Sequence, residues 1–94
     1  MIKFVWDDKK NQINIKKHGI SFQEAATVFQ DEEALIIVDE GHSQHEERFV
    51  LIGFSYKANL LVVCHCYRDK ESAIRIISAR KASRREREEY TKRL

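Results

Sequence analysis

The stretch 75-RIISARKASRREREEY-90 decides the C-terminal part of the fold, because a strand-like run changes there into an arginine-rich helix. The β-branched residues at its start predict a strand over Ala73–Ala79. Ser83-Arg-Arg-Glu86 has the spacing of a capping box, in which serine and glutamate satisfy the first backbone N–H groups of a helix. We expect that helix to continue to about Arg93.

Upstream of this junction, the same criteria predict two helices and four more strands. Asp7 or Asp8 caps a helix that runs to His18, where Gly19 fits a left-handed stop. A second capping box begins at Ser21 and opens the next helix. The remaining strands are expected at Ile2–Trp6, Ala34–Asp39, Arg48–Phe54 and Leu60–Tyr67.

These elements predict an α+β domain with the order β-α-α-β-β-β-β-α. Because the connections between the last four strands are short, we expect an antiparallel sheet with the helices packed on it. Phe22, Ala25, Ala26 and Phe29 follow helical spacing and are expected to face the core. With 94 residues, no proline and no low-complexity linker, the chain is interpreted as a single domain over residues 1–94.

Arginine is concentrated in the C-terminal third, although the formal net charge is only +2. Seven of the eight arginines follow Lys57, namely Arg68, Arg75, Arg80, Arg84, Arg85, Arg87 and Arg93. The planar guanidinium binds phosphate or carboxylate through two hydrogen bonds, and a helix N-terminus adds unpaired N–H groups. This region is therefore expected to hold an anion. The alternative for the helix is a solvated face with internal ion pairs.

Composition argues against a membrane protein and against a metal site. No apolar run approaches the ~20 residues of a membrane helix, and the first residues lack the apolar core of a signal peptide. We therefore expect a cytoplasmic protein. Cys64, His65 and Cys66 point alternately to opposite faces of a strand, so they cannot converge on one ion, and His42 and His45 add only two ligands. We expect no metal and no cofactor, and we interpret both cysteines as reduced, buried thiols.

Strand alternation predicts a basic row across the sheet. With both hairpins in their simplest registers, His65 lies between Arg48 and Arg75 on the neighbouring strands. A slip of one residue would move a strand's side chains to the other face. Two arginines and a histidine are costly to bury in an apolar core, but they suit an open cleft that receives an anion. Arg80 arrives beside this row at the end of the last strand.

Such a row fits RNA cleavage without a metal, which needs a base for the 2′-hydroxyl, a stabilised phosphate and an acid for the leaving oxygen. Arginines supply the second, and His65 is the candidate acid or base. Glu24 and Glu86 are weaker base candidates, and Tyr90 is a candidate for positioning the phosphate. The alternative for His65 is a structural histidine that bonds across the strands.

Several blocks of the sequence resemble the BrnT family of type II toxins, small ribonucleases of bacterial toxin–antitoxin pairs. In chain order they are Phe4–Asp7, Asn14–Ala25, Val28–Phe29, Glu47–Phe49, Ile52–Gly53, Arg75–Glu86 and Tyr90. Any single block is a weak signal, whereas several blocks in the same order over nearly the whole chain are a strong one.

The resemblance implies a RelE-like fold and a metal-independent endoribonuclease that blocks translation and growth. It implies a DNA-binding antitoxin of the BrnA type, through which alone the toxin reaches operator DNA. It marks the arginines Arg48, Arg75, Arg80, Arg84 and Arg85 as functional positions. His65 enters from strand geometry only, and His18 belongs to the family pattern as a helix stop with a candidate RNA contact.

Two further expectations concern binding. The arginine-rich junction is expected to be covered by the antitoxin, with the sheet edge at Ala34–Asp39 as a second route through strand addition. The alternative function is a basic module that binds RNA or an acidic protein segment without chemistry.

Overall fold

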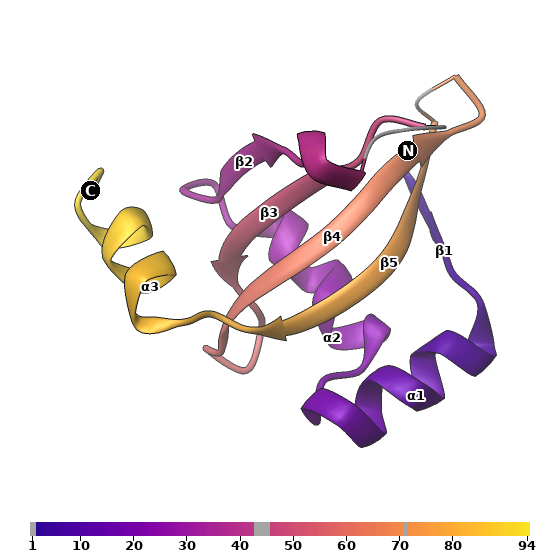
Figure 1. Ribbon diagram of the computed structural model, residues 1–94, viewed down its shortest axis with the longest axis horizontal. Coiled ribbons are helices and arrows are strands. Elements are labelled where there is room, and N and C mark those ends of the chain that lie inside the picture. Colours follow the sequence, from indigo (N-terminus) through magenta and orange to yellow (C-terminus); the bar gives the residue numbers. More distant parts are fainter. Residues whose placement is uncertain (1, 43–45, 71) are drawn as a thin grey trace.

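The computed structural model describes residues 2–42, 46–70 and 72–94. Its elements, in chain order, are β1 (Lys3–Val5), α1 (Asp8–His18), α2 (Phe22–Thr27), η1 (Val28–Gln30), β2 (Leu35–Val38), η2 (Glu40–His42), β3 (Phe49–Phe54), β4 (Leu60–Arg68), β5 (Ala73–Lys81) and α3 (Arg84–Thr91), where η marks a 3₁₀ turn. The predicted α+β class is confirmed (Figure 1). None of the helices among the described residues has the length and apolar composition of a membrane span.

The sheet has five strands in the order β1-β5-β4-β3-β2. Strands β2 to β5 form the expected antiparallel meander. The expectation of a wholly antiparallel sheet is wrong, because β1 pairs parallel with β5, Lys3 opposite Ala73 and Val5 opposite Arg75. Alternation along a strand assigns faces but not the direction of its partner, so the sequence pattern carried no signal for this pairing.

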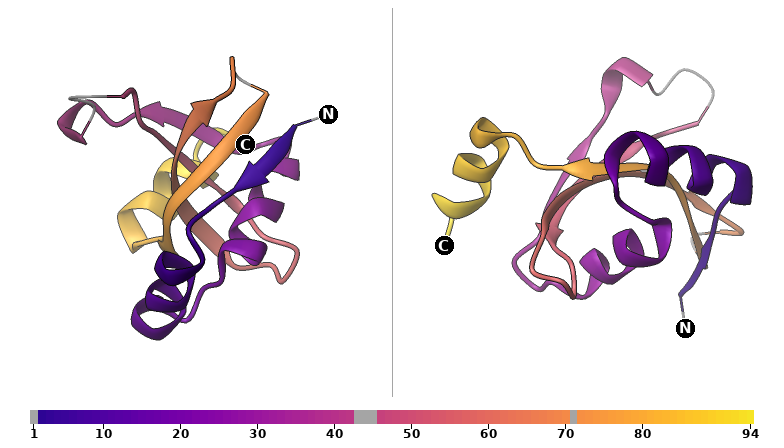
Figure 2. Two further views of the ribbon diagram at one scale, coloured as in Figure 1. Left: turned by 90° about the vertical axis from the view of Figure 1, so that its right-hand side faces the viewer. Right: turned by 90° about the horizontal axis from the view of Figure 1, so that it is seen from below.

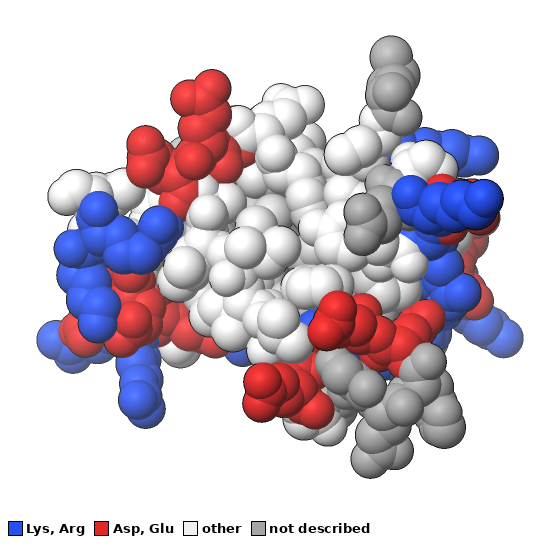
Figure 3. Space-filling model, turned by 90° about the horizontal axis from the view of Figure 1, so that it is seen from above, with Lys and Arg blue, Asp and Glu red and all other residues white. Residues whose placement is uncertain are grey.

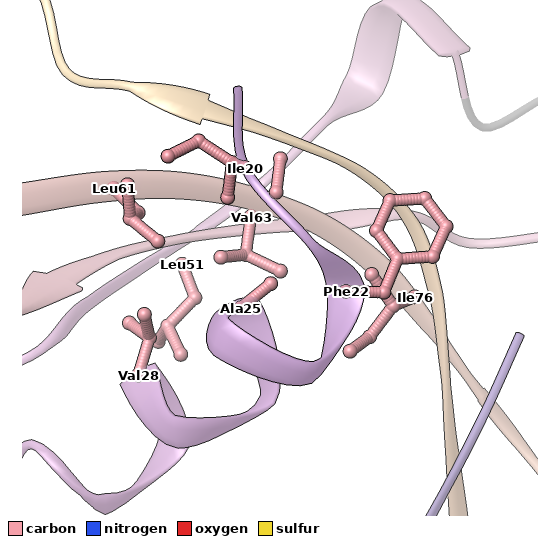
Figure 4. Packing of buried hydrophobic residues seen from close by; sticks show 9 residues of the cluster. Ile20, Phe22, Ala25, Val28, Leu51, Leu61, Val63 and Ile76 are labelled. Atoms are coloured by element: carbon pink, nitrogen blue, oxygen red, sulfur yellow. The ribbon is translucent and has the colours of Figure 1, made fainter. Parts of the chain in front are cut away.

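Helices α1 and α2 lie on one side of the curved sheet (Figure 2). The main core forms there from Ile20, Phe22, Ala25, Val28, Leu51, Leu61, Val63, Ile76 and Ala79 (Figure 4). Phe22 and Ala25 are fully buried, as their helical spacing predicted, while Ala26 and Phe29 pack at the margin of this cluster. This side of the sheet is therefore covered by α1, α2 and the main hydrophobic core.

Polar contacts fix α1 on the sheet. Asp7 caps its N-terminus through Lys9 N and Lys10 N, and Gly19 ends it in the left-handed region at φ 73°. The buried amide of Asn14 donates to Ile20 O and Ala79 O at 2.8 Å, and its oxygen accepts from Ala79 N. One side chain thus ties the helix to β5.

Helix α3 packs against the opposite side of the sheet, near the ends of the strands (Figure 1). The ring of Tyr90 is buried edge-on against Phe54 at 5.4 Å between centroids. Its hydroxyl donates to Asp31 Oδ2 at 2.7 Å. We call this side of the sheet the α3 face. Only one end of it is covered by the cluster around Tyr90, which comprises Ile52, Leu60, Val62 and Tyr90.

The pairing of β4 with β5 contains an irregularity that shapes the α3 face. Cys64 lies opposite Ser78, but the next residue, His65, lies opposite Ile76. Ile77 is therefore an extra residue on β5, as in a β-bulge. Bulges redirect side chains, and the extra residue Ile77 adjoins Ser78 and Arg80 on that face.

Candidate functional site

A cavity of about 270 Å³ opens on the α3 face, over the middle of the sheet. Eight described residues line it, namely Asp39, Arg48, Val50, Val62, Cys64, Ile77, Ser78 and Arg80. They come from strands β3, β4 and β5 and from the segments that flank β2 and β3. The structure thus brings two of the predicted arginines, Arg48 and Arg80, to one cavity.

Arg80 is held in a defined position by the first turn of α3. Its Nη1 and Nη2 atoms donate to the two carboxylate oxygens of Glu86 at 2.7 and 2.8 Å. Glu86 also accepts from Ser83 N, so the capping box of α3 anchors the arginine. Hydrogen bonding from Arg80 lowers the pKa of Glu86 to about 2, and the same bonds raise the pKa of Arg80. Both groups are therefore charged at neutral pH.

The cavity floor combines a thiol, a hydroxyl and apolar side chains. Cys64 is half-buried, and burial together with nearby Asp39 raises the pKa of its thiol. The thiol is therefore protonated near neutral pH and is not an activated nucleophile. Arg48 is half-buried, and among the described lining residues Asp39 contributes the carboxylate. Sequence reasoning did not select Asp39, which it placed at the end of the predicted strand Ala34–Asp39; the structure ends that strand at Val38.

The predicted row of Arg48, His65 and Arg75 is wrong, because the register differs by one residue from the one assumed. Phe49, not Arg48, lies opposite His65, and Ile76 lies on its other side. His65 consequently points to the helix-covered side and is fully buried. Burial lowers the pKa of its ring, whose Nδ1 lies 3.2 Å from Val63 O.

Aromatic rings surround His65 at centroid distances of 4.8 Å for Phe29, 5.6 Å for Tyr67 and 6.0 Å for Phe49. Its Nε2 atom is buried without a hydrogen-bond partner in the described part of the chain. A neutral ring in this setting has no access to a phosphate on the α3 face. The alternative interpretation, a structural histidine, fits these contacts, although its bond runs along its own strand.

The α3 face carries Cys66 where the row was expected to carry His65. Arg75 lies directly opposite Cys66, and Arg48 directly precedes the partner of His65. Cys66 is buried, and burial raises the pKa of its thiol. The half-buried Arg75 does not line the cavity.

The four predicted RNA-binding residues lie in three different settings. Arg84 and Arg85 are exposed in the first turn of α3, and Arg84 Nε lies 3.7 Å from Glu88 Oε1. Tyr90 is buried, bonded to Asp31 and absent from the cavity lining, so the structure places it away from the position at which a phosphate contact was predicted. His18 ends α1, which packs on the other side of the sheet from the cavity.

The weaker base candidate Glu24 is held in hydrogen bonds away from the cavity. Glu24, a weaker base candidate, is buried and accepts hydrogen bonds from Ser55 Oγ at 2.6 Å and Asn59 Nδ2 at 2.8 Å. Glu24 belongs to α2 and does not line the cavity. Within the described ranges, no three His, Cys, Asp or Glu side chains gather as a set of metal ligands. His45 and the side chain of His42 lie outside the described residues.

The cavity suits a bound anion, and the carboxylate of Asp39 lies in its lining. Two guanidinium groups supply positive charge and forked donors, and Ser78 adds a hydroxyl. In a partly enclosed site such donors are stronger than in water, because fewer water molecules screen them. Phosphate is an anion that arginine side chains bind well in proteins.

Comparisons with known proteins identify the family. Residues 6–86 match the model for the ribonuclease toxin BrnT of type II toxin–antitoxin systems. The crystal structure of the Brucella abortus ribonuclease toxin BrnT is similar, with a TM-score of 0.69 and 27% sequence identity. The match covers 89% of this chain and 100% of that chain. No curated protein matches the sequence.

The chain therefore belongs to the BrnT family of ribonuclease toxins of type II toxin–antitoxin systems. Membership of such a system implies an antitoxin partner.

Proposed function

We propose that this BrnT-family toxin cleaves RNA without a metal ion and that the cavity on the α3 face binds the scissile phosphate. The observation that carries the proposal is the convergence of Arg48 and Arg80 on one cavity. Arginines replace the charge that a metal would bring to the phosphate. Arg80 is held in place by Glu86, which reduces the reorganisation needed when charge develops on the phosphate.

The chemistry follows from the groups that line the cavity. The Asp39 carboxylate takes the proton of the 2′-hydroxyl, whose oxygen then attacks the adjacent phosphorus. The bond from phosphorus to the 5′-oxygen breaks, and that oxygen takes a proton from solvent. The products are a cyclic phosphate and a 5′-hydroxyl. Arg48 and Arg80 stabilise the pentacoordinate phosphate between these two steps.

Membership of the toxin family supports the wider role that we propose. Cleavage of RNA by the free toxin blocks translation and arrests growth, and its RNA substrate places the toxin's action in the cytoplasm. The sheet with two N-terminal helices and one C-terminal helix supports a RelE-like classification. The antitoxin is of the BrnA type, binds DNA, and brings the toxin to the operator only indirectly. An antitoxin segment over the cavity excludes RNA by competition.

Cleavage by purified protein, in the presence of EDTA, is the test. Wild-type protein should cut RNA at an unchanged rate with chelator, and Arg48→Ala should lose about 100-fold or more in rate. Lys16→Ala is the matched control, because it removes one charge from exposed α1, away from the cavity. Activity that vanishes with EDTA and returns with Zn²⁺ or Mg²⁺ would contradict metal independence.

The second candidate function, a basic binding module without chemistry, is distinguished by the same assay. That module would retain RNA binding but leave RNA intact under every condition. Equal cleavage by Arg48→Ala and wild type would instead show that the cavity does not hold the scissile phosphate.

A further inference from the structure

The outer edge of β2 exposes apolar side chains on both faces of the sheet. Ile36, Ile37 and Val38 are 50%, 47% and 43% exposed. Strand β2 ends the sheet, and no further strand of the described chain pairs beyond it. Edge strands of natural proteins usually carry charges, prolines or bulges that prevent pairing with another chain. Residues 35–38 contain none of these.

The backbone at this edge has the right direction for another strand. Asp39 N donates to Arg48 O at 2.8 Å, so the backbone groups of Asp39 point toward β3. Alternation in an antiparallel pair then turns those of Ile37 inward as well, and turns the N–H and C=O groups of Ile36 and Val38 outward. These outward groups form the ladder positions that an incoming strand uses.

The charges around β2 indicate which kind of strand could pair with it. Residues 31–40 contain five acidic residues, Asp31, Glu32, Glu33, Asp39 and Glu40, and no lysine or arginine. They flank the apolar centre at both ends. Figure 3 shows the molecule from above, where white atoms cover the middle of the face, acidic groups border it at the upper left and lower centre, and basic groups lie at its left and right ends.

A second copy of this chain is a poor occupant. Antiparallel pairing of two β2 strands about a twofold axis places the N-terminal acids of one copy beside the C-terminal acids of the other. Both ends of the pair would then bring like charges together, which destabilises cross-strand neighbours. Arg93 lies near Glu33, and Arg48 near Asp39, but two arginines leave a surplus of negative charge.

We propose that the β2 edge receives an extended segment of the antitoxin with an apolar centre and lysine or arginine at its ends. The inference rests on the antitoxin partner that the family implies, but not on the chemistry proposed for the cavity. The position of the β2 edge also links antitoxin binding to inhibition of RNA cleavage. Ile37 pairs with Val50, and both Val50 and Asp39 line the cavity. A strand added at β2 therefore leads directly to the rim of the cavity.

The test measures affinity between the purified toxin and the purified cognate antitoxin. Ile36→Pro removes an outward N–H without removing a bond to β3, and edge strands tolerate proline at such positions. Val38→Lys adds a positive charge at the same edge. It is the second edge variant, for use if Ile36→Pro does not fold. Ile13→Lys is the control, because Ile13 is similarly exposed, at 58%, but lies on α1.

We expect the edge variants to bind antitoxin at least about tenfold more weakly, as the loss of a backbone bond and apolar contact predicts. The control should bind like wild type, and the amides of Ile36 and Val38 should be protected from hydrogen exchange in the complex. RNA cleavage by the free edge variants should be unchanged. Affinity equal to wild type in both edge variants would overturn the proposal.

A toxin dimer in solution that the edge variants dissociate would also overturn it, because a second copy would then occupy the edge. The readouts of affinity, hydrogen exchange and oligomeric state do not depend on RNA cleavage. A toxin that binds its antitoxin at β2 but leaves RNA intact would refute the proposed chemistry while supporting this inference.

Discussion

Arg80 and Glu86 join the last strand to the last helix through two parallel hydrogen bonds of 2.7 and 2.8 Å. The arginine lines the cavity, whereas the glutamate belongs to the capping box of α3. The start of the helix is therefore fixed to the group that we expect to stabilise the phosphate. This relationship accounts for the position of Arg80 at the junction between β5 and α3.

The first prediction concerns Arg80. Arg80→Ala should lower kcat for RNA cleavage by about 100–1,000-fold, because it removes one donor to the transition state. Arg80→Lys should recover only part of this loss, since an ammonium group cannot make the forked pair with Glu86. Circular dichroism of both variants should match wild type. Full activity in a folded Arg80→Ala protein would remove this residue from the site.

The second prediction concerns His65, which the register places in the core. His65→Phe should retain RNA cleavage, because the ring has no access to the cavity and aromatic neighbours surround it. A folded protein in which this substitution abolishes cleavage would restore a catalytic role for the histidine.

His65 should also make wild-type stability depend on pH. Burial holds the ring pKa below its ordinary value of 6.5, so the unfolded chain takes up a proton that the folded chain does not. The free energy of unfolding should therefore decrease as the pH falls below about 6.5. Urea titrations at several pH values should show this component in wild type and not in His65→Phe.

The elements were predictable because their signals are local. The capping box at Ser83, the cap by Asp7 and the stop at Gly19 need only neighbouring residues, and the structure contains all three. Ser21 caps α2 as predicted, but the carboxylate of Glu24 bonds Ser55 and Asn59 and does not complete the second capping box. The burial of Phe22 and Ala25 followed from helical spacing in the same way.

The site was harder to predict because it depends on contacts between distant segments. The turn between β4 and β5 pairs Arg68, and not Tyr67, with Ala73, and this one-residue difference places Cys66 instead of His65 opposite Arg75. The bonds from Asn14 to Ala79 and from Tyr90 to Asp31 join residues 65 and 59 positions apart. No local pattern identifies such pairs. Arginine density did indicate Arg80, since that signal does not depend on register.

The third prediction concerns Tyr90, a structural anchor of α3. Tyr90→Phe should lower the free energy of unfolding by about 1–2 kcal/mol, because Asp31 loses a hydrogen bond from the hydroxyl. Cleavage of RNA by the folded variant should be unchanged. Urea denaturation and kcat, measured on the same preparation, check both parts, and a selective loss of kcat would restore a role in the site.

The same residue predicts how stability changes in alkali. Burial, with Asp31 as the next cause, raises the pKa of Tyr90 from 10.0 to about 12. The stabilisation is complete below pH 10, where the hydroxyl is protonated in both states, and is lost as the pH rises toward 12. The difference in stability between wild type and Tyr90→Phe should therefore shrink over that range.

The fourth prediction separates the exposed arginines of α3 from the cavity. Arg84 and Arg85 do not line it, and the side chain of Arg84 is 94% exposed. If both contact the RNA backbone, replacing them with alanine should raise KM and leave kcat unchanged, whereas Arg80→Ala should lower kcat.

Each lost phosphate contact should also reduce the slope of log binding constant against log salt by about 0.7 for single-stranded RNA. Lys16→Ala with Lys17→Ala on α1 removes the same charge on the other side of the sheet and is the matched control. An identical salt slope in wild type, the α3 variant and the control would mean that Arg84 and Arg85 form a solvated helix face. A slope reduced equally by both double variants would show that RNA responds to total charge and not to this surface.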